Sequence, residues 1–266
     1  MASAGPGIVA QTVGESGTRD MPVHDHCAHH DDLVRDRNSI LSSALSIAYN
    51  ADAIHMVRAK GCFMYDCRGI GYLDCVNNIM HVGHSHPRIV KVAHAQLQKL
   101  NTNTRYLYES INKYGMNLLA TFPPQFNRIF FVNSGSEAND LALRLATAFT
   151  KRKDILVVRG GYHGSTSSTV ALSDYKFSGK GGEGPPDHVH VADLPDSYRG
   201  KYTGPGCGKK YADGVAQLAA EVNALTPNGG TESTGHVSVR RGVAAFISES
   251  LLSCGGQIVP PEGYLR

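Results

Sequence analysis

The sequence predicts an α/β fold in which a mostly parallel sheet is flanked by helices. From residue 128 onward, short apolar runs with the length of buried strands alternate with longer segments of helical periodicity. Strands that are buried on both faces and joined through helices are typical of parallel sheets. The runs that we interpret as strands are residues 128–132, 154–158, 189–192 and 243–247.

Size and composition indicate a globular protein that acts on small molecules. A chain of 266 residues can form one large α/β domain or two smaller ones. Hydrophobic residues make up 41% and charged residues 18%, unlike a disordered chain. The net charge is only +3 and Lys and Arg are scattered, so we expect no nucleic-acid partner. No apolar stretch approaches the ~20 residues that span a bilayer, so we expect no membrane partner.

The first 30 residues are rich in Gly, Ser, Asp and His and have almost no apolar periodicity, which predicts a disordered tail. They lack the apolar block of a secretory signal and match an Arg-rich mitochondrial presequence poorly. A cytoplasmic or mitochondrial location is therefore left open. A metal cluster is one interpretation of the polar side chains at the end of this stretch, but such tracts are more often solvated, and we assign no metal. These side chains are His24, Asp25, His26, Cys27, His29 and His30.

Residues 31–100 form an N-terminal segment with a helix and a hairpin. Apolar spacing predicts a helix that starts at Asp31 or Asp32 and extends to about residue 48. Residues 62–66 and 72–76 flank a Gly-bearing turn and predict the hairpin. Pro87 fits the first turn of a helix, and apolar residues follow it at helical spacing.

The remaining helices are predicted at residues 111–122, 138–149 and 215–225. The helix at 111–122 ends before two consecutive prolines, Pro123 and Pro124. Residues 178–208 form a long connection rich in Gly and Pro, and residues 226–241 form a polar loop.

Ligands of open parallel sheets bind beyond the carboxyl ends of the strands, so the residues that follow each strand are candidate site residues. After residues 128–132 come Ser134, Gly135 and Ser136, which open a helix. Free N–H groups and the positive end of the helix dipole make such a turn suitable for a phosphate. Simple helix capping by a serine is the alternative, and on physical grounds alone we favour it.

The other two strand ends carry an aromatic ring, an imidazole and a carboxylate. Tyr162 and His163 follow residues 154–158 in a Gly-rich turn, where the ring could stack on a heteroaromatic cofactor or simply pack locally. Glu249 follows residues 243–247 and could orient a cofactor or a substrate cation, although such a Glu is more often solvated. The three turns become informative together, because they would meet at one edge of the sheet.

At these residues the chain resembles the class III aminotransferase family, pyridoxal-phosphate enzymes of fold type I. The resemblance covers about residue 53 to the end and is carried by blocks in a fixed order. These are Tyr-Leu-Asp at 72–74 with Gly-His-Ser-His-Pro at 83–87, Asn-Ser-Gly-Ser-Glu-Ala-Asn-Asp at 133–140, Gly-Tyr-His-Gly at 161–164, and Glu249 with Gly-Gly-Gln-Ile-Val-Pro-Pro-Glu-Gly-Tyr at 255–264.

Within that family the chain is most similar to the ethanolamine-phosphate and 5-phosphohydroxylysine phospho-lyases. The shared segments are residues 100–107, Ser-Asp-Tyr-Lys-Phe at 173–177 and Asp-Ser-Tyr-Arg-Gly-Lys-Tyr at 196–202. This similarity implies that the enzyme eliminates phosphate from a phosphorylated amine or amino acid with pyridoxal 5'-phosphate as cofactor. A class III ω-amino acid aminotransferase is the alternative activity, because fold and cofactor do not fix the reaction.

The resemblance also implies roles for individual residues. Ser134, Gly135 and Ser136 would hold the cofactor phosphate, Tyr162 would stack on the pyridine ring with His163 beside it, and Glu249 would be the acidic catalytic residue near cofactor and substrate. Residues 101–266 would be an incomplete large cofactor-binding domain, truncated before the C-terminal domain, and the full-length protein would be a homodimer. Family members continue into an Asp for the pyridine nitrogen and a Schiff-base Lys. We therefore also keep the hypothesis of a non-catalytic fragment and expect no turnover by this polypeptide alone.

Overall fold

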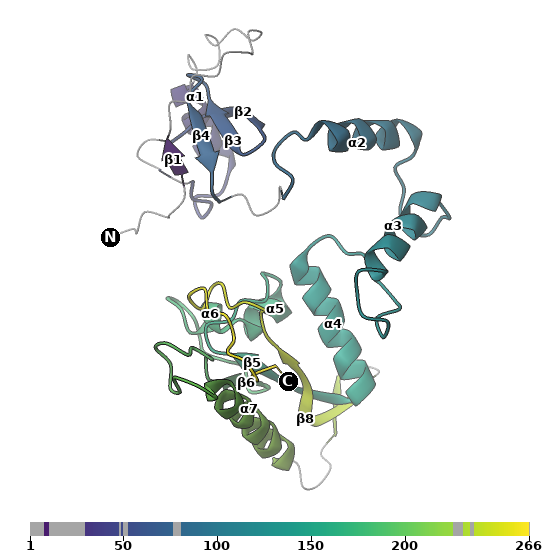
Figure 1. Ribbon diagram of the computed structural model, residues 1–266, viewed down its shortest axis with the longest axis vertical. Helices are drawn as coiled ribbons and strands as arrows, with labels where there is room; N and C mark the ends of the chain where they lie inside the picture. The colour runs from purple at the N-terminus through teal and green to yellow at the C-terminus, as the bar shows by residue number, and fades with distance from the viewer. Residues whose placement is uncertain are drawn as a thin grey trace. The chain divides into compact units, whose positions relative to one another are not determined.

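A computed structural model describes residues 8–10, 30–47, 49, 53–76, 81–225, 231–234 and 237–265. The chain divides into two compact units, Met1–Glu109 and Ser110–Arg266 (Figure 1). Among the described residues, no helix has the length and apolar character needed to cross a bilayer.

The first unit contains an antiparallel sheet of four strands in the order β1-β4-β3-β2. The strands are β1 (Ile8–Ala10), β2 (Met56–Lys60), β3 (Phe63–Asp66) and β4 (Gly71–Asp74). The predicted hairpin is confirmed, with Phe63 opposite Leu73. Strand β1 falls inside the predicted tail, whereas residues 1–7 and 11–29 lie outside the described residues, and with them most of the His-rich cluster.

The described residues of the first unit also form two helices. Helix α1 (His30–Ile40) ends short of the predicted extension to residue 48. Helix α2 (Pro87–Lys99) begins at the predicted proline, which needs no N–H partner in the first helical turn.

The second unit is an α/β sandwich built on one sheet. Its elements in chain order are α3 (Glu109–Leu119), α4 (Gly135–Thr150), β5 (Arg152–Val158), α5 (Ser167–Leu172), α6 (Asp174–Phe177), β6 (Val189–Ala192), α7 (Cys207–Ala224), β7 (Thr231–Thr234) and β8 (Val237–Ile247). The sheet order is β6-β5-β8-β7. Strand β5 pairs in parallel with both β6 and β8, and only β7 is antiparallel. The predicted, mostly parallel sheet is therefore confirmed.

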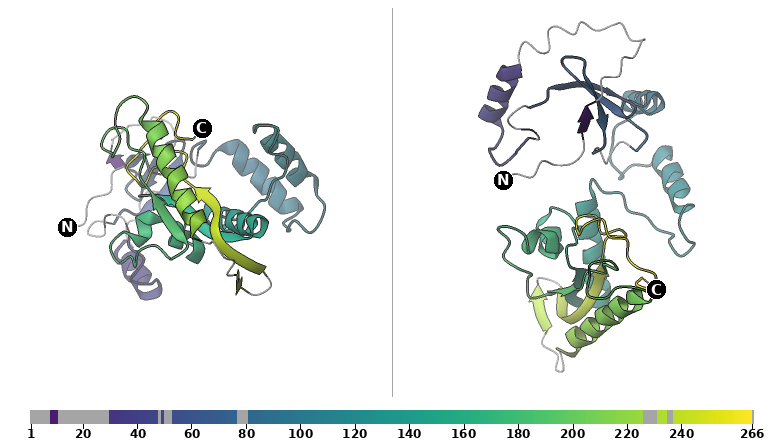
Figure 2. Two further views of the ribbon diagram at one scale, coloured as in Figure 1. Left: turned by 90° about the horizontal axis from the view of Figure 1, so that it is seen from below. Right: turned by 60° about the vertical axis from the view of Figure 1, so that its left-hand side comes forward.

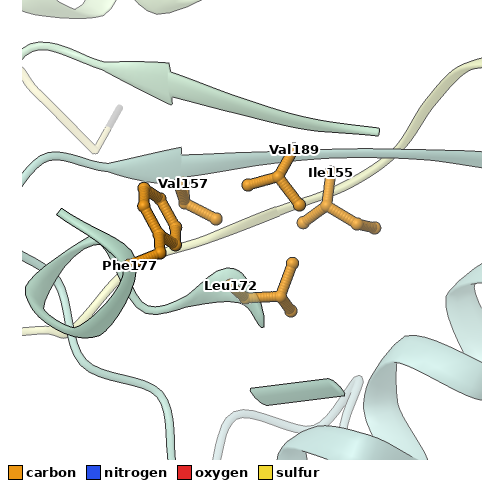
Figure 3. Packing of buried hydrophobic residues seen from close by; sticks show 5 residues of the cluster. All are labelled: Ile155, Val157, Leu172, Phe177 and Val189. Atoms are coloured by element: carbon orange, nitrogen blue, oxygen red, sulfur yellow. The ribbon is translucent and has the colours of Figure 1, made fainter. Parts of the chain in front are cut away.

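Helices α4 and α7 flank this sheet. Figure 1 shows β8 between α4 and α7, and Figure 2 shows α7 running alongside β8 from two further directions. The main core cluster joins β5, β6 and the two short helices α5 and α6 (Figure 3), and partly buried residues of α4 and β8 pack against it. Its buried members are Ile155, Val157, Leu172, Phe177 and Val189.

The structure corrects two predicted elements. Residues 128–132 are irregular rather than a strand, because a strand needs hydrogen bonds from a neighbour and no described strand pairs with them. Phe130 is accordingly 66% exposed. The predicted loop 226–241 contains β7 and the beginning of β8, because these two segments pair with each other from Thr231↔Arg240 to Thr234↔Val237.

Candidate functional site

The candidate site lies at the carboxyl ends of two parallel strands of the second unit. Strand β5 ends at Val158 and β8 ends at Ile247, and the parallel pairing of Val157 with Ile247 places both ends at the same edge of the sheet. The turn with Tyr162 and His163 follows β5, and Glu249 follows β8. Sheet topology therefore brings two of the predicted turns together.

The third predicted turn, at the start of α4, directly contacts the turn after β5. The backbone N–H of Ser165 donates to Ser136 Oγ at 3.0 Å. The side-chain amide of Asn139 donates to the carbonyl oxygen of His163 at 2.7 Å. These two hydrogen bonds hold the start of α4 beside the turn after β5, although the bonded residues are 24 and 29 positions apart in the chain.

Gly164 makes this close approach possible. Its φ of +133° lies in a region that L side chains rarely adopt. A Cβ atom at this position would lie 2.6 Å from Ser136 Oγ and 2.9 Å from Ser136 Cα. Any residue other than glycine would therefore push the two turns apart.

The start of α4 combines capping with room for an anion. Ser134 Oγ accepts the backbone N–H of Glu137 at 3.1 Å, so the capping interpretation of this serine is confirmed. No atom lies within 4 Å of a Cβ built on Gly135. Within the described part of the chain, no acceptor is found for the N–H groups of Gly135 and Ser136. Capping and phosphate binding use different groups of this turn, so the two interpretations are compatible.

Tyr162 presents a half-buried ring at the same edge. Its hydroxyl is 2.7 Å from Ser165 Oγ, which fixes the ring to its own turn. The ring of Tyr175 packs against it edge-on, with centroids 6.3 Å apart and an interplanar angle of 79°. A ring held in this way is suited to stacking on a flat heterocycle.

His163 is buried beside Tyr162 and keeps one ring nitrogen without a partner. It is 5% exposed, and among the described residues Nε2 has no hydrogen-bond partner. Burial lowers the pKa of the His163 imidazole below its ordinary value, so the neutral form is favoured. Most buried polar atoms in proteins are hydrogen-bonded, so such an atom indicates a position where a ligand can bind.

Glu249 carries a second unpartnered buried atom. Its Oε2 has no hydrogen-bond partner among the described residues. Burial raises the pKa of the Glu249 carboxyl, and hydrogen bonds from the backbone N–H groups of Tyr162 and Cys254 partly offset this effect. The hydrogen bond from the Tyr162 N–H also connects the residues after β8 to the turn after β5.

Two residues that the sequence analysis gave no role hold the aromatic turn in place. Ser173 Oγ accepts the backbone N–H of His163 at 2.8 Å, and Asp174 Oδ2 accepts that of Gly160 at 2.6 Å. Both side chains are buried, Ser173 completely and Asp174 at 5% exposure. The signal that could have found them is their segment, residues 173–177, which carries part of the family resemblance.

The residues present fit pyridoxal phosphate. The unpaired N–H groups and the open space at Gly135 suit its phosphate, and the ring of Tyr162 suits its pyridine. The unpartnered atoms of His163 and Glu249 suit its polar substituents or a substrate. This set of donors, acceptors and one aromatic face matches the chemical groups of the cofactor.

Comparison with known proteins places these features in a family. The family model described as aminotransferase class-III matches residues 46–266. A Drosophila melanogaster protein named alanine–glyoxylate aminotransferase 2-like is 43% identical over 237 residues, which cover 88% of this chain and 46% of the relative. A Caenorhabditis elegans protein named ethanolamine-phosphate phospho-lyase homolog 1 is 36% identical, with 89% of this chain and 50% of the relative covered.

Solved structures share the fold of this chain. A phospholyase from Arthrobacter in complex with phosphoethanolamine matches with a TM-score of 0.74 and 30% identity, covering 88% of this chain and 51% of that chain. The taurine:2-oxoglutarate aminotransferase from Bifidobacterium kashiwanohense, solved with pyridoxal phosphate and glutamate, shares the fold at a TM-score of 0.70 and 22% identity, with 88% and 51% covered. The chain spans about half the length of the relatives it matches.

Proposed function

Because this chain belongs to the class III aminotransferase family and has the fold type I architecture, we propose that its second unit binds pyridoxal phosphate. We propose further that the whole protein is a phospho-lyase, which eliminates phosphate from a phosphorylated amine or amino acid. The chain spans about half of its relatives, so we assign cofactor binding to this polypeptide and the reaction to the whole protein.

One observation carries the cofactor proposal. The hydrogen bond from Ser165 N–H to Ser136 Oγ, 3.0 Å long, sets the head of α4 directly beside the turn that bears Tyr162. One small molecule with a phosphate at one end and a flat ring at the other can therefore reach both. Two turns on opposite faces of the sheet would not support this proposal.

The residues of this chain would bind and orient the cofactor and substrate. The N–H groups of Gly135 and Ser136 would donate to the phosphate, assisted by the helix dipole, and the Ser134 and Ser136 hydroxyls each keep a proton to donate because their oxygens accept from the backbone. The Tyr162 ring would cover one face of the pyridine and exclude water from it. When bound, pyridoxal phosphate supplies the electron sink for a carbanion next to the substrate amine.

His163 and Glu249 would control protons at this site. A neutral His163 offers Nε2 as an acceptor or a donor, depending on its tautomer. Burial raises the pKa of the Glu249 carboxyl, because the charged form is poorly solvated. A hydrogen bond or a substrate ammonium would stabilise that charged form.

A second candidate reaction is amine transfer to a 2-oxo acid. It is favoured by the 43% identity to a relative named as an aminotransferase, whereas elimination is favoured by the two relatives named as phospho-lyases, at 36% and 30% identity. Phosphate released from phosphoethanolamine, measured with the whole protein, would support the lyase. Amine transfer without phosphate release would support the aminotransferase, and a polypeptide that binds the cofactor without either reaction would support the non-catalytic hypothesis.

Cofactor binding is tested on this polypeptide directly. Titration with pyridoxal phosphate, followed by absorbance, is expected to saturate, and Tyr162→Ala is expected to weaken the affinity about 2- to 10-fold through loss of stacking. Tyr162→Phe keeps the ring and is the matched control. Equal affinity of the Ala variant and the parent would refute the stacking role of this ring.

We propose a homodimer for the whole protein. Helix α4 buries none of its residues completely within its unit, and Phe149 on it is 89% exposed. Apolar surface of this kind is usually covered by a partner or by further chain. Sedimentation of the whole protein tests this proposal. Relatives from Homo sapiens and Arabidopsis thaliana are named as mitochondrial proteins, and we propose a cytoplasmic or mitochondrial location here.

A further inference from the structure

Lys176 places a cation beside the ring of Tyr162. It belongs to the short helix α6, which follows the aromatic turn and α5 in the chain. Its ammonium lies 5.8 Å from the centroid of the Tyr162 ring and 5.6 Å from that of Tyr175. Both distances are within the range of a cation–π contact. The positive charge is thus held at the ring that is proposed to cover the cofactor.

The segment that carries Lys176 contains two kinds of residue. Ser173, Asp174 and Phe177 are buried, and they hold the aromatic turn or fill the core. Tyr175 is 51% exposed and Lys176 is exposed as well. In the described part of the chain, no carboxylate forms an ion pair with the Lys176 ammonium. The ammonium therefore contacts the rings of Tyr162 and Tyr175, and no carboxylate of the described residues neutralises its charge.

The charges of Lys176 and Glu249 both influence the thiol of Cys254. Burial raises the pKa of the Cys254 thiol, the charge of Glu249 raises it further, and the charge of Lys176 lowers it. One thiol is therefore within electrostatic range of an acidic and a basic side chain. A ligand with a cationic and an anionic end would be oriented by this pair.

We propose that Lys176 binds the phosphate group of the substrate and thereby selects phosphorylated amines over unphosphorylated ones. This inference rests on the proposed function. A phosphate carries nearly two negative charges at neutral pH, so Glu249 repels it and the ammonium of Lys176 attracts it. The substrate amine is then directed toward the cofactor and Glu249, while the leaving phosphate stays near α6.

The test compares two ligands that differ only in the phosphate. The polypeptide is first saturated with pyridoxal phosphate, and the affinities for phosphoethanolamine and for ethanolamine are then measured from absorbance changes. Lys176→Met is expected to weaken phosphoethanolamine binding roughly ten-fold, the size of one charge-assisted hydrogen bond. Binding of ethanolamine and of pyridoxal phosphate is expected to stay within about two-fold. Lys176→Arg is expected to retain most of the discrimination, because it keeps the charge.

Lys180→Met is the matched control, since it removes the same charge from an exposed position four residues later in the chain. Weakening of both ligands to the same extent, or no weakening in Lys176→Met, would overturn the inference while leaving the proposed function intact. Failure of the parent polypeptide to bind pyridoxal phosphate would instead overturn the proposed function, and the inference with it.

Discussion

Buried polar groups at the two ends of strand β5 differ in whether they have hydrogen-bond partners. At its beginning Asp154 is completely buried, and both carboxylate oxygens have partners. Oδ1 is 2.9 Å from His190 Nε2, and Oδ2 accepts the backbone N–H of Gly242 at 2.6 Å and Arg241 Nε at 3.1 Å. Beyond the carboxyl end, His163 Nε2 and Glu249 Oε2 are buried without partners among the described residues.

This difference separates a structural site from a candidate functional one. A buried carboxylate with all its bonds made holds three strands together, and the molecule loses stability if it is removed. A buried polar atom without a partner destabilises the fold on its own and is retained where a ligand can bind. The following experiments test this distinction, from the largest expected effect to the smallest.

Asp154→Ala is expected to lower the free energy of unfolding by about 3–5 kcal/mol, because it leaves the buried N–H of Gly242 and the Arg241 guanidinium without their acceptor. Urea denaturation measures the change. Asp193→Ala is the control: it removes an exposed pair with Lys201, 3.1 Å apart, and should change stability by less than about 1 kcal/mol. Similar losses of unfolding free energy in both variants would contradict the structural role of Asp154.

Gly164→Ala is expected to lower stability by about 1–3 kcal/mol through backbone strain and to weaken pyridoxal phosphate binding, because its Cβ separates the two turns. Urea denaturation and cofactor titration measure the two effects. Gly181→Ala serves for comparison, since Gly181 has a φ of +81° but no atom within 4 Å of the added Cβ. Its cofactor affinity should stay that of the parent, and a parallel loss in both variants would argue against the close approach at Gly164.

Glu249→Gln is expected to increase the free energy of unfolding at pH 7, by up to about 1 kcal/mol, because it removes a buried charge. The pKa of Glu249 is raised in the folded state, so the folded protein binds its proton more tightly. The carboxyl therefore destabilises the fold progressively as pH rises through its ordinary pKa of about 4.5 toward the raised value. Denaturation from pH 4 to 7 should show the advantage of Gln disappear at the acidic end. Glu262→Gln, at an exposed position, is the matched control and should change the free energy of unfolding at pH 7 by less than about 0.5 kcal/mol.

His163→Asn is expected to have the smallest effect, seen only on acidification. Burial lowers the pKa of His163, so the unfolded chain binds the proton more readily, and stability falls as pH drops below the ordinary value of about 6.5. The variant does not titrate there and should lose less stability between pH 7 and 5, by about 1 kcal/mol at most. Burial also lowers the pKa of His188, so His188→Asn should act additively, and a decline that is unchanged in both variants would argue against neutral buried histidines.

The sequence predicted the sheet and the meeting of the turns after β5 and β8, because both follow from local patterns. The turn at the start of α4 was placed at this edge because of a strand at residues 128–132, which the structure does not form. Apolar runs of strand length identified β5 and β6, and the residues after a parallel strand necessarily lie at its carboxyl edge. The phosphate and stacking roles of Ser136 and Tyr162 remain predictions. The contact between these turns depends on Ser165 and Asn139, whose partners are 29 and 24 residues away and leave no periodic trace.

Other features could not be predicted for the same reason. Residues 128–132 have the composition of a strand, yet pairing depends on a neighbour rather than on composition. Asp154 looked like the polar start of a strand, and only the fold reveals its partners. The sequence did not distinguish Lys176 from the other lysines, because its position over the Tyr162 ring depends on the fold.

The partners of Asp154 also bear on the folding kinetics of the protein. His190, Arg241 and Gly242 are 36, 87 and 88 residues away along the chain. Contacts over such separations close large loops, and the entropy of that closure is lost before the contacts are gained. Stopped-flow rates of an Asp154 variant therefore show when this closure takes place. Slower refolding places it before the rate-limiting step, and faster unfolding places it after that step and makes this carboxylate set how long a folded molecule survives.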